Sequence, residues 1–469
     1  MNLAPSIRSG LFAAGILLPI PVLISGCGNM VGPDYESPET GMPASYRYES
    51  SKNGRQAAKR DGWWKIFGDG DLNRLIGDVR ASNHDLKAGL KRVEQARSII
   101  RITAADSYPQ IGASPSAQRS RSSAEIPGGG GTGNLFSAPL SAQWELDLFG
   151  RIRRGVQAAS ADAQAAAEDL NALQLALEAE AAAGYFNLRA LDQEIGIVEA
   201  GVESRKGSLQ LVRDRNELGA VSSLDVSQAE ALLATSEADI ASLRRQRAAQ
   251  EAALAALAGR AASTYHIAPE SLSGNPPSVP AGIPAELLRA RPDIRQVERQ
   301  LAAANARVGV ATAAFYPSVS ITGSLGFRAA DFGNLFSSGA RFWGIGPEVY
   351  VPVFQGGRNK AELARSQARY EEVLETYQQT ILDALAEVET RLSATRLLNT
   401  QAGAQARAVK ASAQALETAR EQYKGGTANY LVVLDAERTA LETERQQALL
   451  RGANFINTVN LLRALGGRW

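Results

Sequence analysis

The chain has 469 residues, with 50 Lys and Arg against 49 Asp and Glu. A net charge so close to zero argues against electrostatic binding to nucleic acid, which needs a basic face. The single cysteine excludes an internal disulfide framework, and two histidines, His84 and His266, leave little material for a metal site. We therefore expect no nucleic-acid partner, no metal and no cofactor.

The N-terminus has the pattern of a secretory signal peptide over residues 1–26. Arg8 gives a thin positive region, an apolar run covers residues 11–24, and small residues precede Cys27. This cysteine is the only one in the chain, and its surroundings resemble a bacterial lipobox, in which the cysteine is acylated, for example with palmitate. The plain alternative is an ordinary signal peptide with an unrelated cysteine. Lipoproteins kept in the inner membrane usually carry Asp at the next position; Gly28 stands there, so the resemblance points to outer-membrane lipid.

Three later segments alternate between apolar and polar residues: 140–148, 318–327 and 343–353. Each has about the length of a tilted membrane strand. No stretch after the signal reaches the roughly 18 consecutive apolar residues that a membrane helix needs, so a membrane-crossing part would have to be strands closed into a barrel. Alternation is also typical of a half-buried soluble sheet, so by itself it favours a barrel only weakly.

Local similarities at a nearly constant offset indicate an internal duplication. Tyr108-Pro109 matches Tyr316-Pro317, and residues 83–86 match residues 291–294, both at 208 positions apart. A repeated unit of about 200 residues predicts a first repeat over 27–275 and a second over 276–469. The mapping also predicts a fourth strand near residues 110–121. Each repeat then holds one hairpin, at about 110–148 and about 318–353, with loops near 122–134 and 328–341.

The remaining sequence predicts long helices. Residues 140–268 and 353–469 contain no proline and are rich in Ala, Leu, Glu, Gln and Arg, which are strong helix formers. Apolar residues spaced by three and four, from Leu188 to Val212 and from Ile381 to Leu392, predict a coiled-coil seam. The helical pattern breaks at two glycine-containing turns, which we expect to be hairpin tips: Leu218-Gly219-Ala220 and Gly425-Gly426-Thr427.

A set of motifs runs in order along the chain. They are residues 31–35 (VGPDY), 63–64 (WW), 144–151 (WELDLFGR), 291–294 (RPDI), 314–317 (AFYP), 352–358 (PVFQGGR) and 430–436 (YLVVLDA). Together they resemble the TolC-like outer-membrane efflux factor family, and within it the lipoproteins of the NodT and OprM type.

The resemblance implies a mixed α and β membrane protein. Three copies, with four strands each, would form a twelve-stranded β-barrel that continues into a long α-helical coiled-coil tunnel in the periplasm. The homotrimer would be the passive exit duct of a tripartite efflux pump, working with a periplasmic adaptor (membrane fusion) protein and an inner-membrane pump of the RND type. We find no convergent acid–base or nucleophile set and expect no enzyme. The alternative is a non-transporting periplasmic coiled-coil scaffold or adaptor lipoprotein, which would not need amphipathic strands.

The resemblance also assigns roles to the second tip. Leu431 and Asp435 are four residues apart and share one helix face, so in a trimer each would form a ring of three around the axis. OprM-type proteins carry their aperture at these motif positions, which makes these two residues, with Arg438 one turn further, the expected gate. The alternative from residue types alone is that Leu431 packs in the coiled coil and Asp435 is a solvated charge. The two tips are expected to receive the adaptor, or else to be plain turns.

Overall fold

The computed structural model describes residues 30–48, 62–127, 130–282 and 284–467. Cys27 and the signal segment lie outside the described residues. The chain divides into two compact units. The first, which we call the strand unit, comprises Met1–Tyr35, Ile100–Ala159 and Ala304–Arg369. The second, the helical unit, comprises Glu36–Ile99, Ser160–Ala303 and Tyr370–Trp469.

Six of the eight described helices form three pairs of equal length. The eight helices are α1 Gly70–Ser82, α2 His84–Ala105, α3 Arg151–Glu217, α4 Ser223–Leu257, α5 Leu287–Ala290, α6 Pro292–Ala313, α7 Arg358–Lys424 and α8 Tyr430–Ala464. Helices α3 and α7 have 67 residues each, α4 and α8 have 35 each, and α2 and α6 have 22 each. The fold is therefore duplicated, as the sequence predicts. The repeat boundary between residues 275 and 276 stays a prediction.

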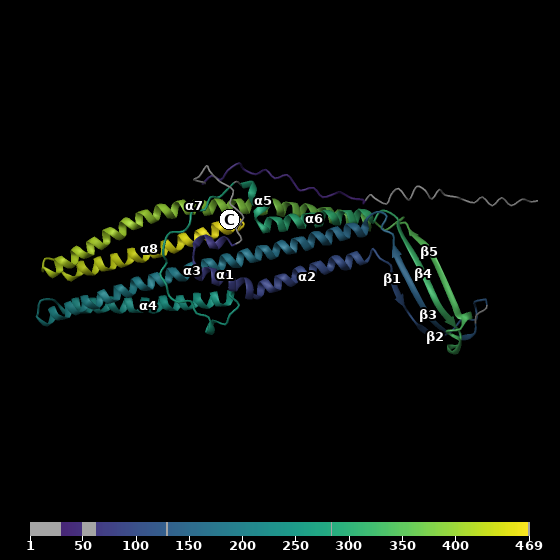
Figure 1. The fold of residues 1–469 in the computed structure, drawn as a ribbon, viewed down its shortest axis with the longest axis horizontal. Coiled ribbons are helices and arrows are strands. Elements are labelled where there is room, and N and C mark those ends of the chain that lie inside the picture. The colour runs from purple at the N-terminus through teal and green to yellow at the C-terminus, as the bar shows by residue number, and fades with distance from the viewer. Residues whose placement is uncertain (1–29, 49–61, 128–129, 283, 468–469) are drawn as a thin grey trace, which may run out of the picture. The chain divides into compact units, whose positions relative to one another are not determined.

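The strand unit holds one antiparallel sheet (Figure 1). Its strands are β1 Gln110–Ala113, β2 Ser116–Arg121, β3 Thr132–Glu145, β4 Ser318–Ala329 and β5 Arg341–Tyr350. The order is β1-β3-β4-β5, and β2 pairs with the other end of β3. The predicted fourth strand near 110–121 is thus present, but Pro115 interrupts it, because proline donates no ladder hydrogen bond.

The ends of β3 and β5 also differ from those that the alternation of apolar and polar residues predicts. β3 begins at Thr132, so the end of the loop predicted near 122–134 is wrong. It ends at Glu145 rather than at residue 148, because the Asp147 carboxylate caps α3 by accepting from the backbone N–H groups of Ile152 (3.0 Å) and Arg153 (2.9 Å). β5 ends at Tyr350, two residues before Pro352.

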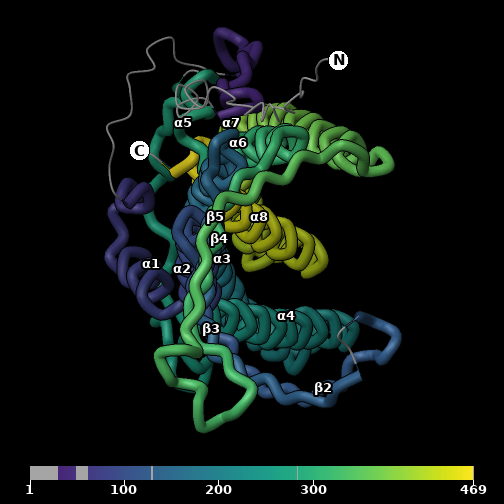
Figure 2. Tube along the Cα trace, turned by 90° about the vertical axis from the view of Figure 1, so that its right-hand side faces the viewer, coloured from purple at the N-terminus to yellow at the C-terminus, as the bar shows by residue number. Residues whose placement is uncertain are grey.

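The helical unit is built on two helix pairs, α3 with α4 and α7 with α8. In Figures 1 and 2, α8 lies between α7 and the α3–α4 pair. The predicted seam residues of α3 are buried: Leu188, Leu191, Ile195, Val198, Val202, Leu209 and Val212. Ile381, Val388 and Leu392 of α7 are buried as well, so the coiled-coil prediction is confirmed. At 1.5 Å per residue, a helix as long as α3 extends roughly 100 Å.

An aromatic core anchors the N-terminal part of the helical unit. Trp63 and Trp64, in a short 3₁₀ helix over Trp63–Phe67, are buried, and the Trp63 indole donates to the Glu178 carboxylate at 3.1 Å. The Phe186 ring packs against the rings of Phe67 and Phe455, both at 4.8 Å between centroids. Among the described residues, no helix combines the length and apolar character needed to cross a membrane.

Candidate functional site

The sheet of the strand unit has one apolar and one polar face. In an antiparallel sheet, residues directly opposite each other point to the same side. The register gives three apolar rows, Leu140/Leu325/Trp343, Ala142/Gly323/Ile345 and Trp144/Ile321/Pro347. The intervening rows, Ser141/Ser324/Gly344, Gln143/Thr322/Gly346 and Glu145/Ser320/Glu348, are polar or small.

Neither face is covered within the described chain. Trp343 is 80% exposed, and Ile345, Leu325 and Val349 are also exposed on the apolar side. Large exposed apolar surfaces mark sites of contact with lipid or with another protein. In the described chain, moreover, the β1–β2 edge and the β5 edge have no partner strand. The sheet therefore has an apolar face, a polar face and two edges without a partner strand in the described chain.

The junction between β3 and α3 seats the N-terminal segment Met30–Tyr35. Arg154 is buried and donates to the carbonyl oxygens of Val31 (3.2 Å) and Gly32 (3.1 Å), and it pairs with Asp34 at 2.9 Å. A Cβ atom on Gly32 would lie 2.5 Å from the Cα atom of Gly309, so only glycine fits this approach. Cys27 precedes Met30 by three residues, a reach of about 10 Å.

The two tips have the same construction. α3 ends at Glu217 and is followed by Gly219 with φ 73°, while α7 ends at Lys424 and is followed by Gly426 with φ 73°. Ser222 caps α4 through a capping box with Asp225, and Asn429 caps α8 by accepting from the backbone N–H of Val432. The predicted tips thus lie at helix ends, and the first one presents Leu218, which is 83% exposed.

Arg215 connects the two tips. Its guanidinium donates to the carbonyl oxygens of Tyr423 (2.9 Å) and Lys424 (3.1 Å) at the end of α7, and it lies 4.5 Å from the centre of the Tyr423 ring. Tyr423 packs in turn against Tyr430, with 5.6 Å between ring centroids. Burial raises the pKa of the Tyr430 hydroxyl to about 12. The second tip is therefore held by cation–π and hydrogen-bond contacts as well as by apolar packing.

The predicted gate residues lie on the exposed side of α8. Tyr430, Val433, Glu437 and Ala440 form its buried face. Leu431 is 55% exposed, and Asp435 and Arg438 are exposed too. Leu431 thus does not pack in the seam of the single chain. The structure brings the three residues onto neighbouring turns of one helix, and within the described residues no ion pair joins Asp435 to Arg438.

A buried polar cluster next to the gate helix was missed from the sequence. Glu437, 4% exposed, accepts from the Ser208 hydroxyl and from the Arg420 guanidinium, both at 2.8 Å, while Arg420 also contacts Ser204. Buried Arg205 lies nearby, and burial lowers its pKa. One signal was available: Glu437 continues the spacing of Tyr430 and Val433 on the apolar face, and a charge in that phase needs a buried partner.

The described residues contain no group of three or more His, Cys, Asp or Glu side chains placed to hold a metal ion.

The family model for outer membrane efflux proteins matches residues 75–260 and 283–467. The chain belongs to the outer membrane efflux protein family. It is 32% identical to the cation efflux system protein CusC of Escherichia coli, over 97% of this chain and 98% of CusC. It is 30% identical to SilC, named a probable outer membrane lipoprotein, of Salmonella typhimurium, over 95% of this chain and 97% of SilC.

Among solved structures, the outer-membrane channel OprN matches with a TM-score of 0.88 and 34% identity, covering 93% of this chain and 99% of OprN. The family, the fold class and the outer-membrane localisation predicted from the sequence are therefore confirmed. The roles of the individual site residues stay predictions.

The Arg215 contact gives a testable consequence. Arg215→Ala removes two hydrogen bonds from a charged donor, each worth about 1–3 kcal/mol, so the backbone amides of residues 425–430 should exchange at least roughly tenfold faster. Hydrogen exchange followed by mass spectrometry measures this. The control is Arg213→Ala on the same helix, which removes only an exposed ion pair to Glu230. Equal exchange in both variants would show that Arg215 does not hold the second tip.

Proposed function

We propose that this chain is the outer-membrane channel subunit of a tripartite efflux pump, and that three copies form the channel. The main observation that supports the proposal is the sheet, which has an uncovered apolar face and two edges without a partner strand. Unpaired backbone groups in lipid cost several kcal/mol each, so the edges must be closed by strands of other copies. Two copies would give a small barrel filled with side chains, whereas three leave room for a pore.

The channel is a passive duct for molecules delivered by an inner-membrane pump of the RND type through a periplasmic adaptor, and it has no enzymatic activity. CusC is named for cation efflux. Kinship with it does not fix the cargo, because a passive duct takes whatever its pump delivers.

The gate of the proposed channel consists of Leu431 and Asp435, assisted by Arg438. Both are exposed on one face of α8, just after the second tip, so three copies can bring them together around an axis. A ring of leucines narrows and dewets an opening, and a ring of carboxylates attracts cations. These contacts would lie between copies, which fits the lack of an Asp435 ion pair within the described single chain.

The gate and the channel are tested together in a planar bilayer. The purified trimer should conduct, and Leu431→Ala combined with Asp435→Ala should raise single-channel conductance and make cells more sensitive to vancomycin. Native mass spectrometry in mild detergent checks that both proteins are trimers. No channel events from the wild type would favour the periplasmic scaffold or adaptor lipoprotein instead. Wild-type conductance in a trimeric double mutant would place the gate elsewhere.

The two tips, Leu218-Gly219-Ala220 and Gly425-Gly426-Thr427, dock the adaptor. Support comes from their shared construction and from open space around Gly219 and Gly426, where an added Cβ would meet nothing within 4 Å. Leu218 is 83% exposed at the first tip and offers a contact for an apolar partner surface.

Leu218→Ser should therefore reduce cross-linking to the adaptor by about tenfold, because it removes an apolar side chain that becomes buried on docking. The control is Leu449→Ser, an exposed leucine of α8 well away from the tips. Cross-linking yield is measured on trimers of each variant. Undiminished yield with Leu218→Ser, or an equal loss with Leu449→Ser, would contradict docking at the tip.

Cys27 is the lipid anchor in this proposal. Arg154 contacts Val31, Gly32 and Asp34, four to seven residues after Cys27, and so would keep an acylated cysteine near the junction of β3 and α3. The similarity to SilC, which is named a probable outer membrane lipoprotein, supports the assignment. Several acyl chains on one cysteine anchor a protein stably.

Cys27→Ser should abolish incorporation of labelled palmitate, while efflux persists because the strands also hold the protein in the membrane. Arg154→Gln, which leaves Cys27 intact, should retain the label and serves as the control. Intact-mass measurement of the mature wild type checks the anchor directly, and an unmodified Cys27 there would refute it.

A further inference from the structure

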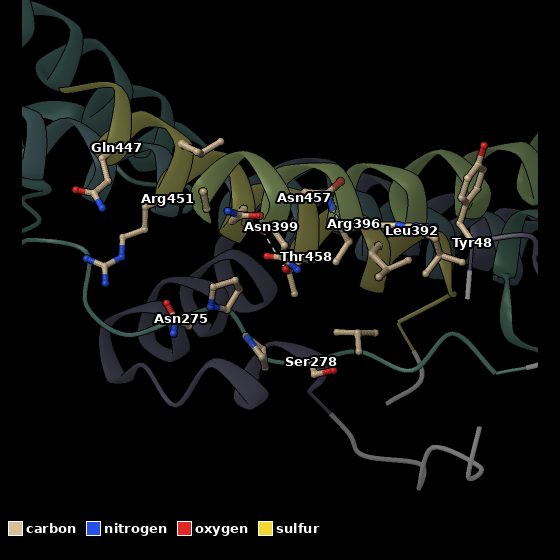
Figure 3. Close-up of a pocket in the computed structure, with 18 of the residues that line it drawn as sticks. Tyr48, Asn275, Ser278, Leu392, Arg396, Asn399, Gln447, Arg451, Asn457 and Thr458 are labelled. Carbon is tan, nitrogen blue, oxygen red and sulfur yellow. Dashed lines mark hydrogen bonds between the residues drawn. The ribbon is translucent and has the colours of Figure 1, made fainter. Parts of the chain in front are cut away.

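Two surfaces of the described chain lie outside the proposed gate, tips and anchor. The first is a polar cavity of about 860 Å³ in the helical unit, lined mainly by α7, α8 and the loop 275–279. In Figure 3, Asn399 and Thr458 lie between Arg396 and Arg451, so the two guanidinium groups do not meet at one ligand. The second is the loop end of the apolar sheet face, next to the β2–β3 and β4–β5 turns, where the arrangement of charges does select a ligand.

The register defines the apolar face over the whole sheet. This face holds the odd-numbered residues of β1, β2, β4 and β5 and the even-numbered residues of β3. Along β4 it extends from Val319 to Ala329, which is about 34 Å of strand. At the tilt of a membrane strand this gives a height of roughly 25 Å, the height of the apolar band on a membrane barrel.

Charge occurs at only one end of this face. Its charged residues among the described strands are Arg119 and Arg121 of β2 and Arg341 of β5, all exposed and all close to the turns. No strand residue of the face is Asp or Glu. At the other end, where the strands continue towards the long helices, the face finishes with Trp144 and Val349 and carries no charge. The face is therefore cationic at the loop end and neutral at the helix end.

Aromatic rings accompany the arginines at the loop end. Phe136 of β3 and Phe327 of β4 belong to the apolar face. Phe332 packs against Phe136 with 5.5 Å between ring centroids, and Phe336 packs against Phe327 at 5.3 Å. Aromatic girdles of this kind lie at the boundary between hydrocarbon and headgroups, where an arginine on the lipid side costs little. The long arginine side chains can reach the headgroups from this level.

The three arginines come from the two edges of the sheet. β2 lies at one edge and β5 at the other. In the proposed trimer, on which this inference rests, the β5 edge of one copy meets the β1–β2 edge of the next. Arg341 of one copy and Arg119 and Arg121 of its neighbour then lie at the loop end of the same seam, on the side that faces lipid. Arg119 and Arg121 are about 7 Å apart along β2, so the seam offers more than one place for an anion.

The chemistry of these side chains identifies the ligand. Guanidinium groups bind phosphate through paired, charge-assisted hydrogen bonds. Within the part of the chain that the structure describes, no ion pair joins Arg119, Arg121 or Arg341 to an acidic side chain. Several arginines spread along one seam suit a headgroup with more than one phosphate, and their position at the loop end alone selects the outer leaflet. We propose that each seam of the trimer binds a lipid of the outer leaflet whose headgroup carries at least two phosphates.

Native mass spectrometry of the full-length trimer, titrated with lipid in detergent micelles, tests the proposal. Diphosphoryl lipid A is the probe, and monophosphoryl lipid A, with the same sugars and acyl chains but one phosphate fewer, is the matched comparison. Up to three probe molecules should bind per trimer, at least about fivefold more tightly than the comparison lipid, because a phosphate paired with arginine is lost from the latter. Equal binding of the two lipids, or no binding of the probe, would overturn the proposal.

Arg341→Gln should weaken binding of the probe about tenfold, and so should Arg119→Gln combined with Arg121→Gln, because each variant removes guanidinium groups from the same seam. The control is Arg328→Gln. Arg328 lies at the same end of the sheet but on the polar face, opposite Ser137, with its guanidinium 4.8 Å from the centre of the Phe342 ring. The lipid site is refuted if Arg328→Gln weakens binding as much as Arg341→Gln, or if neither arginine variant of the seam changes it.

Failure of the lipid site can be told from failure of the channel. A trimer that conducts in the planar bilayer but does not bind diphosphoryl lipid A would keep the channel and remove the lipid site. A chain that forms no trimer has no seam, and that result would remove both.

Discussion

The structure depends on a constraint of backbone hydrogen bonding. A sheet that leaves both faces and both edges uncovered by its own chain is not stable in water, where its apolar rows are exposed, nor alone in lipid, where its edges are unpaired. The register resolves the first difficulty, because it places Trp343, Ile345 and Leu325 on one side and Ser141, Thr322 and Glu348 on the other. One face then suits hydrocarbon and the other suits water. The edges are the part that a single chain cannot satisfy, and they make assembly a requirement.

The short motif from Trp144 to Arg151 joins the two kinds of architecture. Glu145 ends β3 and pairs with Arg151 at 2.8 Å, Asp147 caps α3, and Gly150 makes the turn with φ 82°. One helical turn later, Arg154 seats the N-terminal segment. Glu145, Asp147 and Arg154 therefore all have polar partners at the point where the strand passes into the helix. Because of these contacts, a sheet that faces lipid can pass directly into a helix of 67 residues without a disordered connection.

Much of this fold follows from the sequence, and the limits have physical causes. Alternation locates three strands, and the repeat locates the fourth, whose own alternation is poor because residues 114–121 are almost all polar. The seam from Leu188 to Val212 follows from spacing alone. By contrast, Arg420 with Glu437, and Arg215 with Tyr423, depend on which helices lie side by side, and nothing in the local spacing encodes that.

The two repeats place matching residues in different surroundings. Glu230 of α4 and Glu437 of α8 occupy corresponding positions, each eight residues after the residue that caps its helix, Ser222 or Asn429. Glu230 forms an exposed ion pair with Arg213, which contributes little stability because water and salt screen it. Glu437 is buried against Ser208 and Arg420, with its second oxygen unpaired, so removing Arg420 would leave a buried carboxylate without its ion-pair partner. The same residue type therefore fixes the position of α8 in one repeat and is nearly neutral in the other. The packing around each glutamate, rather than its identity, decides how much that glutamate contributes to the position of its helix.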